Sequence, residues 1–191
     1  KAGAGSDANA NADSQSKTDD GSTAADDASQ NDSDDQSMAA PFADVPLTDQ
    51  YGVEHTLSQY KGKVVLLNFF ATWCGPCKQE IPDIEALYKE YGENSQDLVV
   101  LGIANPSTEG NMNAADGTVE ELEAFIDEQG ITCPVLMDTT GKLFSGYGIS
   151  AFPTTFMISA NGDIYGYITG ALSASMLQSI VDQTFEGQPA N

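Results

Sequence analysis

Two of the chain's three cysteines, Cys74 and Cys77, are separated only by a Gly-Pro dipeptide in the stretch NFFATWCGPCKQEIP. A pair at this spacing could be a structural disulfide, half of a metal site or a redox couple. A disulfide closing so short a loop removes little entropy from the unfolded chain. A metal site needs two further ligands, and Cys133 and His55 form no second pair at a ligand spacing. The sequence therefore favours a redox couple and predicts no metal site.

The pair stands where a predicted strand ends and a predicted helix begins. Residues 63–71, KVVLLNFFA, are almost continuously apolar, which is typical of a central strand covered on both faces. Apolar side chains then recur at helical spacing from Ile81 to Tyr91. At the start of this helix the helix dipole and free N–H groups would stabilise a thiolate, so we expect Cys74 to be exposed and its thiol pKa to lie below about 8.5. Cys77 should be more buried and should resolve the mixed disulfide that Cys74 forms.

The remaining elements follow from hydrophobic periodicity and turn residues. The sequence predicts a leading hairpin in residues 42–63, strands at 97–104, 133–138, 154–159 and 163–170, and helices at 118–130, 139–149 and 173–187. Early strands alternate with helices, which predicts a parallel core, and the final hairpin adds antiparallel strands at its edge. The expected fold class is α/β, with a central mixed sheet flanked by helices, in one domain over residues 42–191.

Residues 1–41 have a different composition from the rest. They contain no Val, Ile, Leu, Phe, Tyr or Trp, and nine aspartates against two lysines. A segment with so little to bury cannot offset its ordering entropy, so we expect a disordered acidic tether. An acidic docking tail is the alternative. The whole chain has a net charge of −22 and no arginine, which makes nucleic acids and anionic lipid surfaces unfavourable partners.

The long polar leader also bears on location. No stretch approaches the roughly 18 apolar residues of a membrane span. The chain starts at Lys1 rather than Met, and a polar leader ahead of a compact domain suits a protein tethered by a removed signal or a lipid anchor. We therefore expect an extracytoplasmic, membrane-anchored lipoprotein that touches the membrane only through an anchor upstream of Lys1.

The CGPC motif, preceded by a tryptophan and a buried strand, resembles the thioredoxin superfamily. More narrowly, LTDQYGVEHTLSQYKGKVVLLNFFATWCGPCKQEIP resembles the membrane-associated thiol–disulfide oxidoreductases of the TlpA/ResA type. The stretches ITCPVLMDTTGKLFSGYGISAFPTTFMIS and NGDIYGYITG extend this resemblance over nearly all of residues 42–185. It implies a thioredoxin-like fold with an N-terminal β-hairpin and an inserted βα element. It also implies a protein-disulfide reductase with no cofactor beyond its redox-active disulfide.

The resemblance also suggests substrate-binding residues. Phe152, Pro153 and Thr154 match the position where the superfamily has a cis-proline beside the sulfurs, and the alternative is a trans proline that opens a strand. The main chain there would bind an extended peptide, together with Trp73. Pro82 would kink the active-site helix, unless the helix ends before it.

A carboxyl group near the sulfurs is the other implied feature. Glu80 resembles the acidic residue that TlpA/ResA-type proteins keep three positions after the second cysteine. A partly buried Glu80 with a raised pKa could accept the proton of Cys77, whereas a solvated surface glutamate is the alternative. Asn68 stands where cytosolic thioredoxins have a buried aspartate. The second acid common in this family is replaced by Asn105 or Pro106.

The third cysteine and the single histidine are the remaining candidate residues. Cys133 is expected to be an inert core thiol, with a third redox-active thiol as the alternative. His55 is assigned no role.

By resemblance, the chain is expected to be a monomer that reduces disulfides of extracytoplasmic proteins such as apocytochrome c, as in cytochrome c maturation. A membrane electron donor of the CcdA/DsbD type would recharge it. The alternatives are a disulfide oxidase or isomerase, a peroxidase, and a non-catalytic module that binds Cu(I) through the two cysteines.

Overall fold

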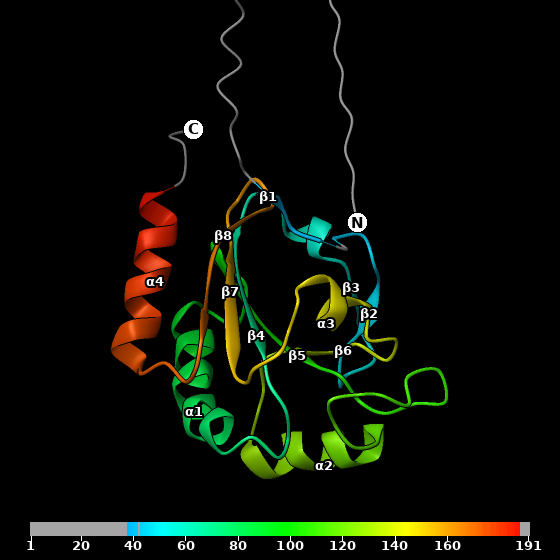
Figure 1. The fold of residues 1–191 in the computed structure, drawn as a ribbon. Coiled ribbons are helices and arrows are strands. Elements are labelled where there is room, and N and C mark those ends of the chain that lie inside the picture. Colours follow the sequence, from blue (N-terminus) through cyan, green and yellow to red (C-terminus); the bar gives the residue numbers. More distant parts are fainter. Residues whose placement is uncertain (1–37, 42, 188–191) are drawn as a thin grey trace, which may run out of the picture. The chain divides into compact units, whose positions relative to one another are not determined.

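The computed structural model describes residues 38–41 and 43–187 (Figure 1). The strands are β1 Met38–Ala39, β2 Leu47–Thr48, β3 Glu54–His55, β4 Val64–Phe69, β5 Leu98–Ala104, β6 Val135–Met137, β7 Thr154–Ile158 and β8 Asp163–Thr169. The helices are α1 Gly75–Glu90, α2 Val119–Gln129, α3 Lys142–Gly146 and α4 Ala174–Glu186, and a 3₁₀ turn, η1, covers Leu57–Tyr60. Every strand and helix that the sequence predicts is present.

The eight strands form one mixed sheet in the order β1-β8-β7-β4-β5-β6-β2-β3. β4, β5 and β6 are parallel, β7 lies antiparallel to β4, and β8 is antiparallel to β7. β2 and β3 form the expected leading hairpin. The predicted fold class, a mixed sheet with a parallel core and an N-terminal hairpin, is confirmed.

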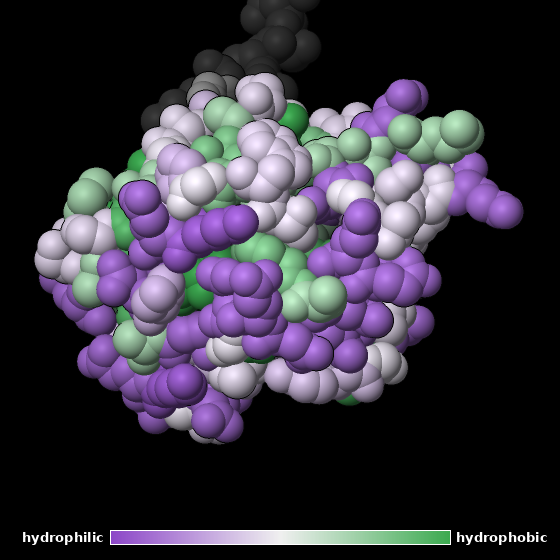
Figure 2. All heavy atoms as spheres, turned by 90° about the horizontal axis from the view of Figure 1, so that it is seen from below, coloured by the Kyte–Doolittle hydropathy of each residue, from purple (hydrophilic) through white to green (hydrophobic). Residues whose placement is uncertain are grey.

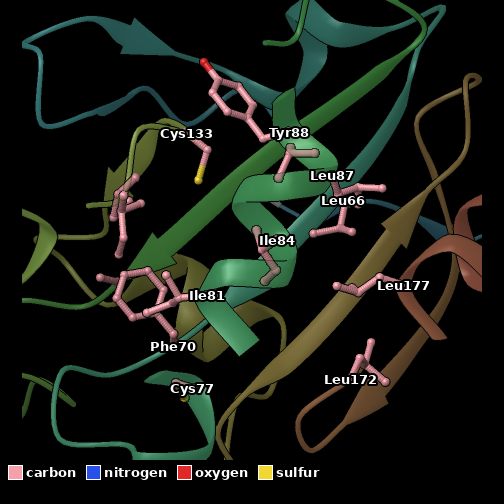
Figure 3. Close-up of a cluster of buried hydrophobic side chains, with 14 of the residues drawn as sticks. Leu66, Phe70, Cys77, Ile81, Ile84, Leu87, Tyr88, Cys133, Leu172 and Leu177 are labelled. Carbon is pink, nitrogen blue, oxygen red and sulfur yellow. The ribbon is translucent and has the colours of Figure 1, made fainter. Parts of the chain in front are cut away.

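The sheet is covered on both faces because successive strand residues point to opposite sides. On one side Leu66 and its neighbours pack against α1, α2 and α4, and Figure 3 shows the part of this core around α1. On the other side Leu67 and Phe69 pack against α3 and η1. All six residues of β4 are buried, as expected for the strand that delivers the chain to Cys74.

Local signals explain the helix that follows β5. The Thr118 hydroxyl accepts a hydrogen bond from the N–H of Glu121, and the Glu121 side chain accepts one from the N–H of Thr118. Gly130 ends α2 in the left-handed conformation, with φ of 65°. Pro82 lies inside α1, which continues to Glu90, so the alternative of a helix ending before Pro82 is wrong.

Residues 1–37 of the tether predicted for residues 1–41 lie outside the described residues. The sheet itself begins at Met38, four residues before the boundary placed at residue 42, since β1 pairs with Ile164 and Asp163 of β8. This pairing uses main-chain groups, so the composition of the segment does not show it. β1 covers only the start of β8, and Tyr165 and Tyr167 farther along that strand are exposed.

None of the helices formed by residues 38–41 and 43–187 has the length and apolar character needed to cross a lipid bilayer.

Candidate active site

Cys74 and Cys77 form a disulfide at the start of α1, with their Cα atoms 5.3 Å apart. Cys74 is the N-cap residue, and its Sγ accepts a hydrogen bond from the N–H of Cys77 at 3.1 Å. The N–H of Cys74 donates to the carbonyl of Ala71, which closes the turn between β4 and α1. The sulfur therefore lies where the helix dipole and its N–H groups favour negative charge.

The expected exposure of Cys74 is wrong for this disulfide form. Cys74 is 3% exposed and Cys77 is 1% exposed, so both belong to the core beneath α1. The disulfide bond to Cys77 and the hydrogen bond from the N–H of Cys77 hold Cys74 Sγ against the first turn of α1. Both sulfur atoms are therefore buried together. The acidity of the Cys74 thiol stays a prediction, because the bonded sulfurs do not titrate.

Glu80 is a buried carboxyl group one turn beyond Cys77, with 1% of its surface exposed. One carboxylate oxygen accepts a hydrogen bond from the main-chain N–H of Leu172 at 2.9 Å, and the other accepts one from Asn68 Nδ2 at 3.0 Å. Burial raises the pKa of Glu80, and the hydrogen bonds from Leu172 and Asn68 oppose this shift. The alternative of a solvated glutamate is therefore wrong, whereas its role as proton acceptor stays a prediction.

Trp73 is the exposed aromatic residue next to the disulfide, with 64% of its surface accessible. Its indole N–H donates a hydrogen bond to the carbonyl of Ala115 at 2.8 Å. Its ring packs edge-to-face against the ring of Phe152, with the ring centroids 5.6 Å apart. The Phe152–Pro153 peptide bond is cis, as the resemblance implies. Thr154 is buried and donates its hydroxyl hydrogen to the carbonyl of Ala151. The structure thus places Trp73 against Phe152, the residue before the cis-proline, and their substrate-binding role stays a prediction.

Two polar residues beside the site escaped the sequence reasoning. Asp116 is buried and accepts hydrogen bonds from the main-chain N–H and the hydroxyl of Thr72, directly before Trp73. Asn105, singled out only as a missing acid, binds the main-chain N–H of Ala115 through its side-chain oxygen. Both lie at the ends of a polar loop, and no local pattern there distinguishes a buried side chain from a solvated one.

Cys133 is buried, and burial together with the nearby charge of Glu85 raises the pKa of its thiol well above the ordinary value. Figure 3 shows Cys133 on the Tyr88 side of α1, away from Cys77. These observations favour the inert thiol. His55 bonds Asp49 through Nε2 at 2.9 Å and the Tyr60 hydroxyl through Nδ1, inside the leading hairpin and η1. Within the part of the chain that the structure describes, no three His, Cys, Asp or Glu side chains are placed to hold a metal ion.

Figure 2 views the molecule from the side where α1 begins and α2 lies in Figure 1. Hydrophilic side chains surround a smaller apolar area on this face. α2 contributes exposed acids there and no basic residue, and Lys78 of α1 lies over the ring of Phe125 at 5.5 Å from its centroid.

The chain is similar to known proteins in both sequence and fold. Residues 38–166 match the model of the AhpC/TSA family. The thiol-disulfide oxidoreductase ResA of Geobacillus kaustophilus (strain HTA426) is 34% identical over 130 residues, which cover 68% of each chain. ResA of Bacillus subtilis (strain 168) is 31% identical over 142 residues, which cover 74% of this chain and 73% of that protein. The crystal structure of the pneumococcal exposed lipoprotein thioredoxin from Streptococcus pneumoniae strain TIGR4 has a TM-score of 0.59 at 25% identity, over 73% of this chain and 98% of that one.

Proposed function

Because this chain belongs to the AhpC/TSA family and is a thioredoxin-like thiol–disulfide oxidoreductase similar to ResA, we propose that it works as a reductase of protein disulfides outside the cytoplasm. The proposal rests on the groups that surround the Cys74–Cys77 pair. A disulfide at a helix N-terminus lies one turn from a buried carboxyl group and next to an exposed tryptophan.

The reaction begins with the reduced protein. The Cys74 thiolate attacks one sulfur of the substrate disulfide, forming a mixed disulfide and releasing the other substrate sulfur as a thiolate. Cys77 then gives its proton to the Glu80 carboxylate and attacks Cys74 Sγ. The second substrate sulfur leaves as a thiolate, the substrate has gained two electrons, and the protein holds the Cys74–Cys77 disulfide.

The surroundings of Glu80 suit this proton transfer. Its raised pKa brings the carboxyl group closer to the pKa of a thiol than an exposed glutamate would be, which favours transfer in both directions. The two hydrogen bonds from Asn68 and Leu172 fix the carboxyl group beneath the first turns of α1. A negative charge held there also disfavours a second negative charge on the sulfurs, and a destabilised thiolate makes the reduced protein the better electron donor.

Trp73 and the main chain beside Pro153 are proposed to hold the substrate. The exposed indole ring offers a broad apolar contact whose orientation is set by Ala115 and Phe152. An extended segment of a substrate protein lying over the exposed part of this ring and along the main chain of residues 153–154 would present its disulfide to Cys74.

Location and partners belong to the same proposal. The pneumococcal structure with a TM-score of 0.59 is that of an exposed lipoprotein, which supports a place outside the cytoplasm with an anchor at the N-terminal side. A role of the cytochrome c maturation type, with a membrane donor of the CcdA/DsbD type returning electrons to a monomeric protein, is part of the proposal because the sequence resembles TlpA/ResA-type proteins. The relatives named thiol-disulfide oxidoreductase ResA support the thiol–disulfide chemistry of this role. No cofactor beyond the disulfide is proposed.

Trapping and redox titration test this function. The reduced protein should reduce a protein disulfide, Cys77→Ser should accumulate the mixed disulfide on Cys74, and Cys74→Ser should do neither. The reduction potential of the pair should lie at about −200 mV or lower, in the range of glutaredoxins and thioredoxin. A potential near the roughly −120 mV of strong oxidants would make the protein an oxidase instead. Rapid consumption of hydrogen peroxide without disulfide reduction would make it a peroxidase.

A further inference from the structure

Asp116 is a buried acid that contacts the chain immediately ahead of the disulfide. It is 8% exposed, and its two carboxylate oxygens accept hydrogen bonds from the main-chain N–H of Thr72 at 3.0 and 3.2 Å. The Thr72 hydroxyl and the N–H of Gly117 donate to the same carboxylate. No ion pair found among residues 38–41 and 43–187 includes Asp116. The buried charge is therefore balanced by hydrogen bonds alone, and most of them come from one residue.

The loop that bears Asp116 is fixed to the sheet by Asn105. Asn105 directly follows β5 and is buried. Its Nδ2 donates to the carbonyl of Asp138 at 2.6 Å, and its Oδ1 accepts from the N–H of Ala115 at 2.9 Å. Its own carbonyl accepts from the N–H of Asp116 at 3.1 Å. The carboxylate is thus held in one place relative to the end of the parallel strands.

This arrangement reaches the redox pair through two residues. Thr72 is fixed by Asp116, and Trp73 is fixed by the carbonyl of Ala115. Cys74 follows at once, at the N-cap of α1. Two residues span about 7 Å at most, so the charge of Asp116 lies within about 10 Å of the Cys74 main chain.

The charge acts against the helix N-terminus. The helix dipole favours the Cys74 thiolate, whereas a buried carboxylate nearby disfavours it. Charged side chains on the elements packed here include Lys78, Glu80, Asp83 and Glu85 of α1, Glu121 of α2 and Asp138 after β6. Glu80, Glu85 and Asp138 are buried like Asp116. The carboxylate of Glu85 accepts hydrogen bonds from the N–H groups of Thr132 and Cys133, and that of Asp138 accepts them from Lys142 and Phe144. Lys78, Asp83 and Glu121 are more exposed and are screened by solvent.

We propose that Asp116 is a positioning residue of the redox site, which fixes the turn before Cys74 and by its negative charge holds the reduction potential of the Cys74–Cys77 pair low. The inference rests on the proposed reductase function and deepens it. Only the reduced protein carries the thiolate, so a charge that disfavours the thiolate shifts the equilibrium toward the disulfide. The protein then gives up its electrons more readily.

Asp116→Asn tests the charge while preserving the shape. The asparagine oxygen still accepts from the Thr72 N–H, and its amide can donate to the Thr72 hydroxyl. Two unit charges about 10 Å apart at an effective dielectric constant of about 20 change an equilibrium about tenfold. The pKa of the Cys74 thiol, measured by the pH dependence of alkylation, should therefore fall. At pH 9, where the thiolate dominates, the equilibrium with glutathione should shift about tenfold toward the reduced protein.

Glu109→Gln is the matched control, because Glu109 lies in the same loop but is exposed. It should leave both readouts unchanged. An Asp116→Asn variant that folds and shows the wild-type thiol pKa and glutathione equilibrium would overturn the proposal. If Asp116→Asn does not fold, Asn105→Ala replaces it. That variant loosens the loop but keeps the carboxylate, and it should shift both readouts in the same direction by a smaller factor, whereas no shift would again overturn the proposal.

Neither readout requires a protein substrate. A wild-type protein that fails to reduce protein disulfides would refute the reductase function while leaving the effect of Asp116 measurable.

Discussion

Replacing Glu80 by glutamine removes the charge of the proposed proton acceptor at almost constant volume. In the wild type both carboxylate oxygens face donors, the Leu172 N–H and Asn68 Nδ2. A glutamine side chain has one oxygen and one NH₂ group, so one of these donors must face another donor. An unpaired buried donor costs about 1–3 kcal/mol.

The burial of the wild-type charge offsets part of this cost. Because burial raises the pKa of Glu80 above its value in the unfolded chain, folding favours the protonated form. This preference contributes fully to the free energy of unfolding at a pH below the pKa of Glu80 in the unfolded chain. The contribution is lost as the pH rises through the pKa of Glu80 in the folded protein. Above that pH the wild type carries a disfavoured charge that Glu80→Gln lacks. We therefore expect the variant to fold, with a stability loss of about 2 kcal/mol or less at neutral pH.

The effect on the reaction should be larger and confined to one step. A positioned general base contributes roughly 10²–10⁴-fold, so the attack of Cys77 on the mixed disulfide should slow about 100-fold or more. The wild-type rate of this step should rise as the pH increases through the raised pKa of Glu80. The rate of the variant should not show this rise. Trp73 is the chain's single tryptophan and adjoins Cys74, so stopped-flow fluorescence can follow the redox state. Acid quenching followed by mass spectrometry would measure the amount of mixed disulfide at each time point.

Glu90→Gln is the control for this experiment, because Glu90 is an exposed glutamate at the far end of the same helix. It should resolve the mixed disulfide at the wild-type rate. Equal resolution rates and equal pH profiles in Glu80→Gln and the wild type would show that the carboxyl group takes no part in proton transfer.

Two further outcomes follow from the site. Trp73→Ala removes the exposed ring that packs against Phe152, so KM for a protein disulfide should rise about 30-fold, since losing such an interface anchor costs about 2 kcal/mol. Reduction of a small disulfide such as hydroxyethyl disulfide should hardly change, and an equal loss for both substrates would contradict a binding role. Cys133→Ala should retain the full kcat/KM, and iodoacetamide should label Cys74 long before Cys133 in the folded reduced protein, because burial raises the pKa of the Cys133 thiol. Comparable labelling rates would show that Cys133 is accessible and reactive.

The sequence predicts those features whose causes lie within a few residues. Thr118, Glu121 and Gly130 carry the complete start and end signals of α2, and the apolar run through β4 requires a buried strand. The cysteine pair and Pro153 are recognisable from adjacent residues alone. For these parts the local pattern and the tertiary structure agree.

Other features depend on residues far apart in the chain. The burial of Glu80 requires Asn68 from β4 and the main-chain N–H of Leu172, which lies 92 positions after Glu80. Asp116 becomes part of the site only because Asn105 ties its loop to the sheet, and β1 exists only because β8 offers it main-chain partners. None of these contacts has a signature in local composition, so the sequence could indicate the redox pair but not its electrostatic surroundings.

The outer edge of β8 is paired with β1 only at Asp163 and Ile164. Residues 165–169 pair with β7 on their inner side, and in the described part of the chain no strand pairs with their outer side. These residues carry two exposed tyrosines and no charge. An edge of this kind readily accepts a strand from another molecule. Against it stands the net charge of −22, whose repulsion extends over about 10 Å at an ionic strength of 0.1 M. Electrostatic repulsion between the negatively charged molecules, rather than a covered strand edge, thus keeps the protein from aggregating. High salt screens this repulsion and low pH neutralises the acids, so both conditions should promote aggregation.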